Sequence, residues 1–229
     1  MTKQTQHRLN TLYTFNSAGR LIGINEPASN QYLPRLVIMR TIESCIFSLR
    51  DDQPEELIPQ IEALIEKEPT SQKLLQPLRH HQQYIALLEK ITPIDVIRSG
   101  PAYIIPKTDH TPRSTRITAE NRHLLQVPYT FSGDRLNFRS PICAIVEDES
   151  VVSLCFCARN TASATEAGAF TAEYARKQGY ASIVVQDWAN AIHASGRIPF
   201  YSTSADNIAS QAVATKLNAI PFASDFSYR

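Results

Sequence analysis

The segment from Ala167 to Ser195 constrains the fold of this chain most, because its pattern changes from strand to helix across one glycine-bearing turn. Ala167–Thr171 has the composition of a short strand, and the turn, called the glycine turn below, is Arg176–Ala181. A helix ended by Gly196 follows, with one apolar side formed by Ile183, Val184, Trp188, Ala191 and Ile192. This succession of strand, turn and helix favours a mixed α/β fold.

The residues before this segment predict strands, then two helices, then a further strand. A hairpin is expected around Asn16–Gly19 and a strand over Arg35–Met39. Gly100–Pro101 marks a break before a short strand, and Thr118 is expected to cap a helix that reaches Gln126. The two helices are predicted from apolar stripes, one of Leu57, Ile58, Ile61, Leu64 and Ile65, the other of Leu74, Leu75, Leu78, Ile85, Leu88 and Ile91.

The residues around the segment in the C-terminal half extend the same pattern. Ile142–Val146 and Val151–Arg159 predict a hairpin with an acidic turn. Ile198–Ser202 predicts a strand, a helix should reach about Leu217, and Ile220–Tyr228 should close the chain as a strand or hairpin. The order of elements along the whole chain is that of a mixed α/β protein.

Length and charge narrow the classes of function. The chain has 229 residues, and since domains typically hold ~100–200 residues, it forms either one large domain or two small ones. Lys and Arg number 23 against 22 Asp and Glu, so the net charge of +1 offers no field for nucleic acid or an anionic membrane. The N-terminus lacks the apolar core of a signal peptide, and no apolar run reaches the ~18–20 residues that cross a bilayer. We expect a cytoplasmic protein without membrane or nucleic-acid partners.

The cysteines and histidines do not predict a metal site. Cys155 and Cys157 fall on the same face of a strand, but no second pair of ligands completes a zinc site. We therefore expect both thiols to be buried among apolar residues. His80 and His81 point in different directions on a helix, which makes a poor chelate. Trp188 is expected in the core. No metal cofactor is predicted.

The glycine turn is the sharpest chemical feature of the sequence. The free N–H groups of a helix's first turn and the positive end of its dipole together bind anions such as phosphate. Gly179 allows the backbone to approach an anion closely, and Arg176 and Lys177 add positive charge. The alternative is an ordinary turn between a strand and a helix. Neither the dinucleotide nor the P-loop fingerprint is present.

The glycine turn resembles the phosphate-binding element of the GNAT superfamily of N-acetyltransferases, written there as Arg/Gln-x-x-Gly-x-Gly/Ala. The match here is Arg176, Gly179 and Ala181. The resemblance is strong over Pro141–Phe222 and fainter before it. It implies a GNAT-like fold, in which helices flank a central and mostly antiparallel sheet, plus an N-terminal α/β module. Further parts similar to one GNAT subfamily are Val152–Arg159, Glu166–Thr171 and Arg197–Ser204.

The resemblance implies an enzyme that transfers an acetyl group from acetyl-CoA to a primary amine. Residues 129–229 would form the acetyl-CoA-binding domain, and residues 1–128 would shape the acceptor site or form a degenerate second lobe. The near-zero net charge favours a small-molecule amine as acceptor, and the expected state is a monomer or homodimer. The cofactor-binding residues that it implies are Phe170, Thr171, Arg176, Lys177, Gln178, Gly179, Tyr180, Ala181, Asn207 and Ser210.

The resemblance implies specific roles for Phe170, Thr171, Asn207 and Ser210. The backbone N–H groups near Phe170 or Thr171 would stabilise the oxyanion, and the same strand would pair with the pantetheine arm. Asn207, and Ser210 nearby, would lie against that arm, although Asn207 also suits the N-cap of a helix.

The candidate catalytic residues are Glu166, whose role the resemblance implies, and Tyr201. Glu166 stands where many GNAT enzymes carry a general base, and the alternative is an exposed glutamate at a strand edge. The tyrosine that usually protonates the leaving thiolate falls at Ala214, so the chain departs from the family there. Tyr201 or a hydroxyl among Ser202, Thr203 and Ser204 is a possible substitute, and an ordinary strand residue is the alternative. A non-catalytic protein that binds CoA or acyl-CoA, as a sensor or interaction module, is the competing hypothesis.

Overall fold

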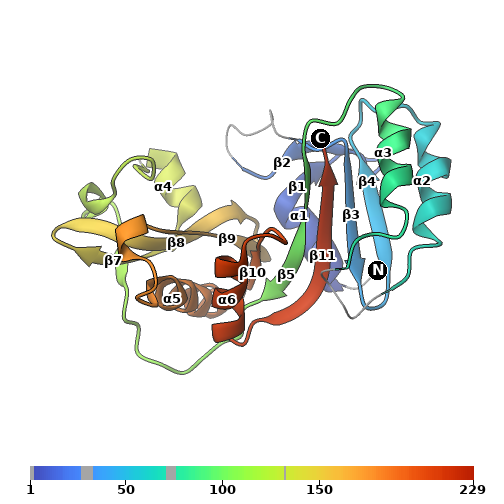
Figure 1. Cartoon of the computed structure of the whole chain (residues 1–229). Coiled ribbons are helices and arrows are strands. Elements are labelled where there is room, and N and C mark those ends of the chain that lie inside the picture. Colours follow the sequence, from blue (N-terminus) through green and yellow to red (C-terminus); the bar gives the residue numbers. More distant parts are fainter. Residues whose placement is uncertain (1–2, 27–32, 71–75, 132) are drawn as a thin grey trace. The chain divides into compact units, whose positions relative to one another are not determined.

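The computed structural model describes residues 3–26, 33–70, 76–131 and 133–229, in two compact units (Figure 1). The first unit comprises Met1–Ala102 with Ser202–Asn207 and Pro221–Arg229. The second comprises Tyr103–Tyr201 with Ile208–Ile220. The end of the chain thus returns to the first unit. The module boundary that the sequence predicts after residue 128 stays a prediction. The two compact units first divide the chain between Ala102 and Tyr103.

The first unit is built on strands in the order β4, β3, β11 and β5, of which β3 pairs antiparallel with both β4 and β11. Along β3, Leu36 and Ile38 face one core and Val37 and Met39 face the other side, as the alternation of a strand requires. The strands are β3 (Leu36–Thr41), β4 (Cys45–Leu49), β5 (Ile97–Ile104) and β11 (Ile220–Tyr228).

Helices cover both faces of this sheet. Helices α2 (Leu57–Ile65) and α3 (His81–Glu89) pack on the Leu36 side, where Leu57, Ile61, Tyr84 and Leu88 are buried. Helix α1 (Lys3–Leu12) and the hairpin of β1 (Tyr13–Phe15) and β2 (Leu21–Ile24) pack on the Met39 side. The apolar stripe of α2 is confirmed, and the predicted second helix is confirmed from His81 onward; Leu74 and Leu75 lie outside the described residues.

The second unit has strands in the order β10, β9, β8, β7 and β6. Strands β6 to β9 pair antiparallel, and β10 pairs parallel with β9. Together with the first unit, this is the mixed α+β and mostly antiparallel architecture that the sequence predicts. The strands are β6 (Thr115–Ile117), β7 (Ile142–Glu147), β8 (Ser150–Asn160), β9 (Ala164–Thr171) and β10 (Ile198–Ser202).

Two cores hold the second unit together. Helices α5 (Tyr180–Ala194) and α6 (Ile208–Lys216) pack on one face, around the fully buried Trp188. Helix α4 (Gly133–Arg139) packs with Phe131 and Phe156 in a second cluster, which also contains residues of β7 and β8. Within the described residues, no helix is both long and apolar enough to span a bilayer.

Helix α1 contradicts the expectation of strands and turns at the N-terminus. Its buried positions include Thr5, Arg8 and Thr11 as well as Leu9, so no apolar stripe marks the helix in the sequence. Arg8 is 1% exposed, and its Nη2 donates to Asp225 Oδ2 at 2.6 Å. A polar buried side held by an ion pair gives no apolar periodicity to read.

Two further local predictions were wrong. Residues 118–126 form only the 3₁₀ turn η2 (Arg122–Leu124), because Asn121 Oδ1 accepts the Thr118 N–H and closes a tight turn instead of a helix. Gly100–Pro101 lies inside β5 and does not break the chain. A Cβ on Gly100 would lie 1.8 Å from the Thr203 carbonyl oxygen, so the glycine serves a close approach of backbone to backbone.

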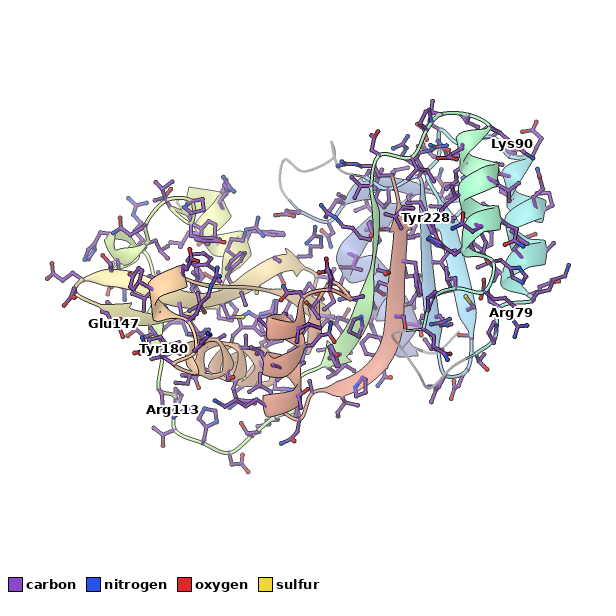
Figure 2. All side chains as sticks on the ribbon, viewed as in Figure 1. Arg79, Lys90, Arg113, Glu147, Tyr180 and Tyr228 are labelled. Atoms are coloured by element: carbon purple, nitrogen blue, oxygen red, sulfur yellow. The ribbon has the colours of Figure 1, made fainter. Side chains whose placement is uncertain are left out.

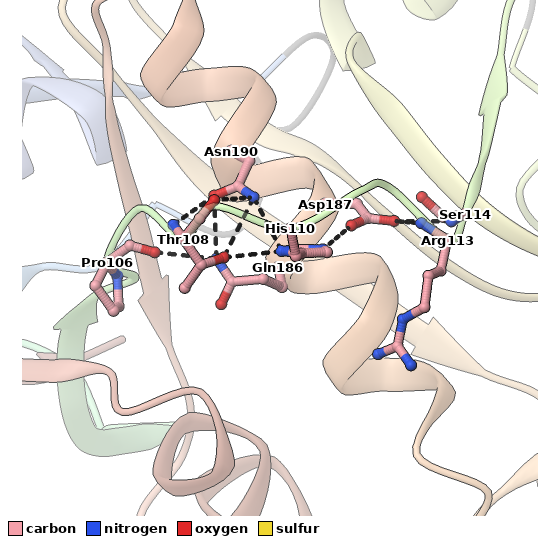
Figure 3. Close-up of polar contacts among 8 residues, drawn as sticks. All are labelled: Pro106, Thr108, His110, Arg113, Ser114, Gln186, Asp187 and Asn190. Atoms are coloured by element: carbon pink, nitrogen blue, oxygen red, sulfur yellow. Dashed lines mark hydrogen bonds and ion pairs between the residues drawn. The ribbon is translucent and has the colours of Figure 1, made fainter.

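A polar network fastens the loop after β5 to helix α5 (Figure 3). Asp187, 4% exposed, accepts from His110 Nε2 at 2.6 Å and from the N–H groups of Arg113 and Ser114 at 2.8 Å. Asn190 Oδ1 accepts the Thr108 N–H at 3.0 Å. Burial raises the pKa of Asp187, but hydrogen bonds from Ser114, His110 and Arg113 outweigh burial, so its pKa lies below the usual value.

We predict that Asp187→Asn lowers the free energy of unfolding by about 1–3 kcal/mol at neutral pH, the range for hydrogen bonds to a charged group. Because the folded-state pKa is lowered, the carboxylate stabilises the protein above about pH 4 and that contribution is lost as the pH falls through the folded pKa. Urea unfolding at pH 7, 5 and 3 should therefore show the two proteins converging in acid. Asp109→Asn, an exposed change on the same loop, is the control. A constant difference at all three pH values would contradict the prediction.

Candidate functional site

The glycine turn ends at the uncapped N-terminus of α5. Gly179 is the N-cap with φ 83°, in the left-handed region that favours glycine, and no side chain caps the helix. Lys177 is also left-handed, with φ 66°. Among the described residues, the backbone N–H groups of residues 179–182 donate no hydrogen bond to the protein. Free N–H groups at the positive end of a helix dipole suit a phosphate.

The predicted turn residues differ in exposure and in the direction of their side chains. Arg176, Lys177 and Gln178 are exposed, and Ala181 is partly buried. Arg176 Nε donates to the Thr171 carbonyl oxygen at 3.4 Å, so its side chain turns back toward the end of β9. Lys177 and Gln178 remain predicted ligands.

Lys216, in the last turn of α6, is a cation of this site that the sequence reasoning missed. Its Nζ lies 3.1 Å from the position that a Cβ on Gly179 would occupy. The side chain is exposed and so is free to meet a ligand at the turn. Lys216 is 37 positions from Gly179 by residue number, and only the packing of α6 beside α5 brings the two together. No local motif points to it.

Tyr180 connects the start of α5 to β7 (Figure 2). Its hydroxyl donates a short hydrogen bond to Glu147 Oε1. That bond raises the pKa of the Tyr180 hydroxyl, so the phenol stays protonated. The contact positions the first residue of the helix, and it also brings a carboxylate close to the glycine turn.

Strands β9 and β10 separate within the second unit. Among the described residues, β10 pairs with β9 only over Ile198–Phe200 and Ala164–Glu166. β9 continues to Thr171 with β8 as its partner, so its other edge is open from Ala167 onward. An open edge of this kind can hydrogen-bond an extended ligand as an added strand.

Glu166 lies at the point where the two strands part. It is 4% exposed, so it is not the exposed strand-edge glutamate of the alternative reading. In the strand register it lies opposite Arg159 of β8, next to a bulge at Ala158. Burial, and to a smaller extent the charge of Glu166, raises the pKa of Tyr201. Bulges redirect side chains and are common beside active sites. Its role as a base stays a prediction.

Phe170 and Thr171 end the open part of β9. The centroid of the Phe170 ring lies 4.7 Å from that of the Tyr129 ring. The Phe170 backbone carbonyl oxygen accepts a hydrogen bond from Ser153 Oγ at 3.1 Å. Thr171 Oγ1 lies 2.8 Å from the same hydroxyl. Both residues are thereby fixed on β8, and their backbone donors remain predicted ligands.

Tyr201 and Ser210 form a pair. Tyr201 is 5% exposed, and its hydroxyl lies 2.7 Å from Ser210 Oγ on α6. Burial raises the pKa of Tyr201 to about 12. Ala214 is buried in the same cluster, one turn further along α6, so the family's usual acid position is filled by apolar packing.

The remaining candidates occupy ordinary places. Asn207 is exposed and directly precedes α6. Cys155 and Cys157 are buried, and burial raises the pKa of both thiols, as expected for core cysteines. Trp188 is in the core, as predicted. His81 Nδ1 contacts the Tyr228 hydroxyl at 2.9 Å. The described residues contain no group of three metal-ligating side chains.

Comparison with known proteins finds likeness at the level of solved structures. No model of a protein family and no curated protein matches the chain. A protein assigned to the GNAT family of acetyltransferases from Novosphingobium aromaticivorans is similar at 13% identity and TM-score 0.47, over 59% of this chain. This chain spans 65% of that structure's length.

Two further solved structures are similar over more of the chain. A GCN5-related N-acetyltransferase-like protein from Streptococcus suis has 16% identity and TM-score 0.49, covering 88% of this chain and 86% of its own. A GNAT-family acetyltransferase from Colwellia psychrerythraea has 13% identity and TM-score 0.47, covering 80% and 76%. These likenesses assign no residue and no activity to this chain, so the site depends on the geometry above.

We predict that Gly179→Ala weakens CoA binding, while a matched change at the other end of α5 does not. Gly196 also has a left-handed φ, of 75°, but a Cβ there meets nothing within 4 Å. Both variants should lose about 1–2 kcal/mol of stability from backbone strain. Calorimetric titration with CoA should show weaker binding for Gly179→Ala alone. Equal affinities in the two variants would remove the turn from the ligand site.

We predict that Lys216→Ala lowers the affinity for CoA about tenfold, the effect of one charge-assisted hydrogen bond. Pantetheine, which lacks phosphates, should bind both proteins alike. The difference for CoA should shrink in high salt because exposed charges are screened. Lys107→Ala is the control, since Lys107 is another exposed lysine of the second unit. An equal loss for pantetheine would contradict a role in phosphate binding.

Proposed function

We propose that this protein is an N-acetyltransferase that uses acetyl-CoA to acetylate a primary amine of a small molecule. The observation that carries the proposal is the open edge of β9 beyond Glu166, which leads through η3 (Glu173–Ala175) to the uncapped start of α5. An extended pantetheine arm and a pyrophosphate need these two features in this order.

The residues of the second unit divide the binding between them. The edge of β9 offers main-chain hydrogen bonds to the pantetheine amides, which favours an extended ligand over a compact one. The N–H groups of residues 179–182 hold the pyrophosphate, and the cations that neutralise it are Arg176, Lys177 and Lys216. Asn207 and Ser210 remain candidates for contacts with the arm.

Glu166 acts as the general base in this proposal. A primary amine has a reference pKa near 10.4, so at neutral pH it must lose a proton before it attacks the thioester. Glu166 accepts that proton directly or through a water, the amine nitrogen bonds to the acyl carbon, and the carbon–sulfur bond breaks. A backbone N–H near Phe170 or Thr171 stabilises the oxyanion, and CoA leaves as the thiolate.

A CoA-binding protein without transfer activity is the second candidate function. The burial of Ala214 in the core favours it, because no tyrosine occupies the usual acid position on α6. Burial raises the pKa of the Tyr201 hydroxyl to about 12, which makes Tyr201 a weak proton donor in its place. Both candidates require CoA to bind, and only the first requires turnover.

We predict that acetyl-CoA binds, and that free CoA is released in the presence of a suitable amine. Acetyl-CoA at 100 times its Kd should stabilise the fold by about 2.7 kcal/mol. Failure of acetyl-CoA and CoA to shift the melting temperature would exclude both candidates. A shift without CoA release across a panel of amines would leave the non-catalytic protein.

Glu166→Gln should lower kcat/KM about 10²- to 10⁴-fold and leave acetyl-CoA binding intact, because Glu166 acts on the proton of the amine. The remaining rate should rise about tenfold per pH unit as the free amine increases. Glu173→Gln, an exposed change in η3, is the control. A rate unchanged across the pH range would remove Glu166 from the mechanism.

A further inference from the structure

Thr108, His110 and Asp187 form a chain of hydrogen bonds within the second unit, between the loop after β5 and helix α5 (Figure 3). His110 Nδ1 lies 2.9 Å from Thr108 Oγ1, and His110 Nε2 lies 2.6 Å from Asp187 Oδ1. A hydroxyl, an imidazole and a carboxylate joined in this order are the parts of an activated nucleophile. Such a group is recognised by its geometry and not by the order of its members in the sequence.

Asp187 decides which nitrogen of His110 carries the proton. Burial raises the pKa of Asp187, but the hydrogen bonds that it accepts lower the pKa below its usual value, so Asp187 is ionised at neutral pH. An ionised carboxylate can only accept hydrogen bonds, and His110 Nε2 must therefore donate to it. In the neutral imidazole the lone pair is then on Nδ1, where it accepts the hydroxyl proton of Thr108. This is the tautomer that a general base for Thr108 requires.

The nucleophile of this group is exposed, and its partners are progressively more buried. Thr108 is exposed, His110 is half-buried and Asp187 is 4% exposed. The backbone N–H and carbonyl oxygen of Thr108 both bond to the Asn190 side chain, at 3.0 Å each. Asn190 Nδ2 also lies 3.3 Å from Thr108 Oγ1, so an amide donor stands beside the attacking atom, near the place where an oxyanion would form. Helix α5 thus fixes the main chain at Thr108, and an acyl donor can approach from solvent.

We propose that Thr108 is a nucleophile that takes an acyl group from an activated ester, with His110 as the general base and Asp187 as a positioning residue. Thr108 Oγ1 bonds to the acyl carbon as the hydroxyl proton passes to His110 Nδ1. The bond between the acyl carbon and the leaving oxygen then breaks, and the leaving alcohol takes the proton from His110. The product is an acyl ester on Thr108. This reaction needs no CoA, so it does not rest on the proposed acetyl transfer.

Treatment of the full chain with p-nitrophenyl acetate, an activated ester without CoA, tests this proposal. A stoichiometric burst of p-nitrophenolate should appear, and peptide mapping by mass spectrometry should find the acetyl group on Thr108. Thr108→Val should abolish the burst, and Thr108→Ser should keep it, because serine also offers a hydroxyl. Thr111→Val, a change of another exposed threonine on the same loop, is the matched control and should keep the burst. A burst of equal size in Thr108→Val would overturn the proposal.

Two further variants test the roles of the base and of the positioning residue. His110→Gln should slow the acetylation of Thr108 about 10²- to 10⁴-fold, the range of general-base catalysis, whereas His123→Gln, at an exposed histidine of the same unit, should not. An unchanged rate in His110→Gln would overturn the role of the base.

Asp187→Asn should slow the acetylation as well, through a change of tautomer. Asp187 Oδ2 accepts the N–H groups of Arg113 and Ser114, so an asparagine would turn its oxygen to them and its NH₂ group to His110 Nε2. Nitrogen NMR of the His110 ring should then show the proton on Nε2 in the unmodified protein and on Nδ1 in Asp187→Asn. The same tautomer and rate in both proteins would overturn the positioning role.

The outcomes also separate this proposal from the proposed function. Acetyl-CoA binding without acetylation of Thr108 by the ester would overturn the nucleophile proposal alone. Acetylation of Thr108 without acetyl-CoA binding would overturn the acetyltransferase proposal and support Thr108 as the nucleophile. Thr108→Val keeps the backbone hydrogen bonds to Asn190, so the test remains decisive even if loss of the Asp187 carboxylate prevents folding.

Discussion

The end of parallel pairing between β9 and β10, at Glu166 and Phe200, is the constraint on which the candidate site of the second unit depends. Before that point β9 has a partner on each side, and beyond it only β8 remains. The bulge at Ala158 faces this point and locally increases the twist of the strands. Gly168 allows the Phe156 ring of β8 to pack closely against β9, because a Cβ at this position would lie 2.6 Å from that ring. Packing on β8 thus keeps β9 in place where β10 leaves it.

The sequence predicts those features that local chemistry decides. Helix α5 starts after Gly179 and ends before Gly196, and both glycines have a left-handed φ. Both ends of the helix could therefore be predicted from the sequence. Helix α1 could not, because its buried side includes Thr5 and Arg8. The pairing of Arg8 with Asp225 joins opposite ends of the sequence, and no periodicity reports such a contact. Lys216 was missed for the same reason.

The balance of charge at the glycine turn explains why Lys216 matters. Glu147 lies beside the start of α5 through its bond to Tyr180, and a carboxylate there opposes the binding of a pyrophosphate. Arg176 and Lys177 are adjacent cations within the glycine turn, but the Arg176 side chain turns back toward the Thr171 carbonyl oxygen. Lys216 approaches from α6 and adds a cation that the local sequence does not contain. The site is therefore assembled from two helices and one hairpin.

The raised pKa of Tyr201 changes the meaning of the missing tyrosine at Ala214. A CoA thiol has a pKa near 8.5, whereas that of Tyr201 is about 12, so full proton transfer from Tyr201 to the thiolate is uphill by about 5 kcal/mol. Tyr201 can hydrogen-bond to a thiolate, but it is a poor proton donor. At neutral pH the departing thiolate can take its proton from solvent, so an acid on α6 is not a condition for transfer. Ala214 alone therefore does not distinguish an enzyme from a binding protein. Glu166, the base of the proposed mechanism, is buried where β9 and β10 part.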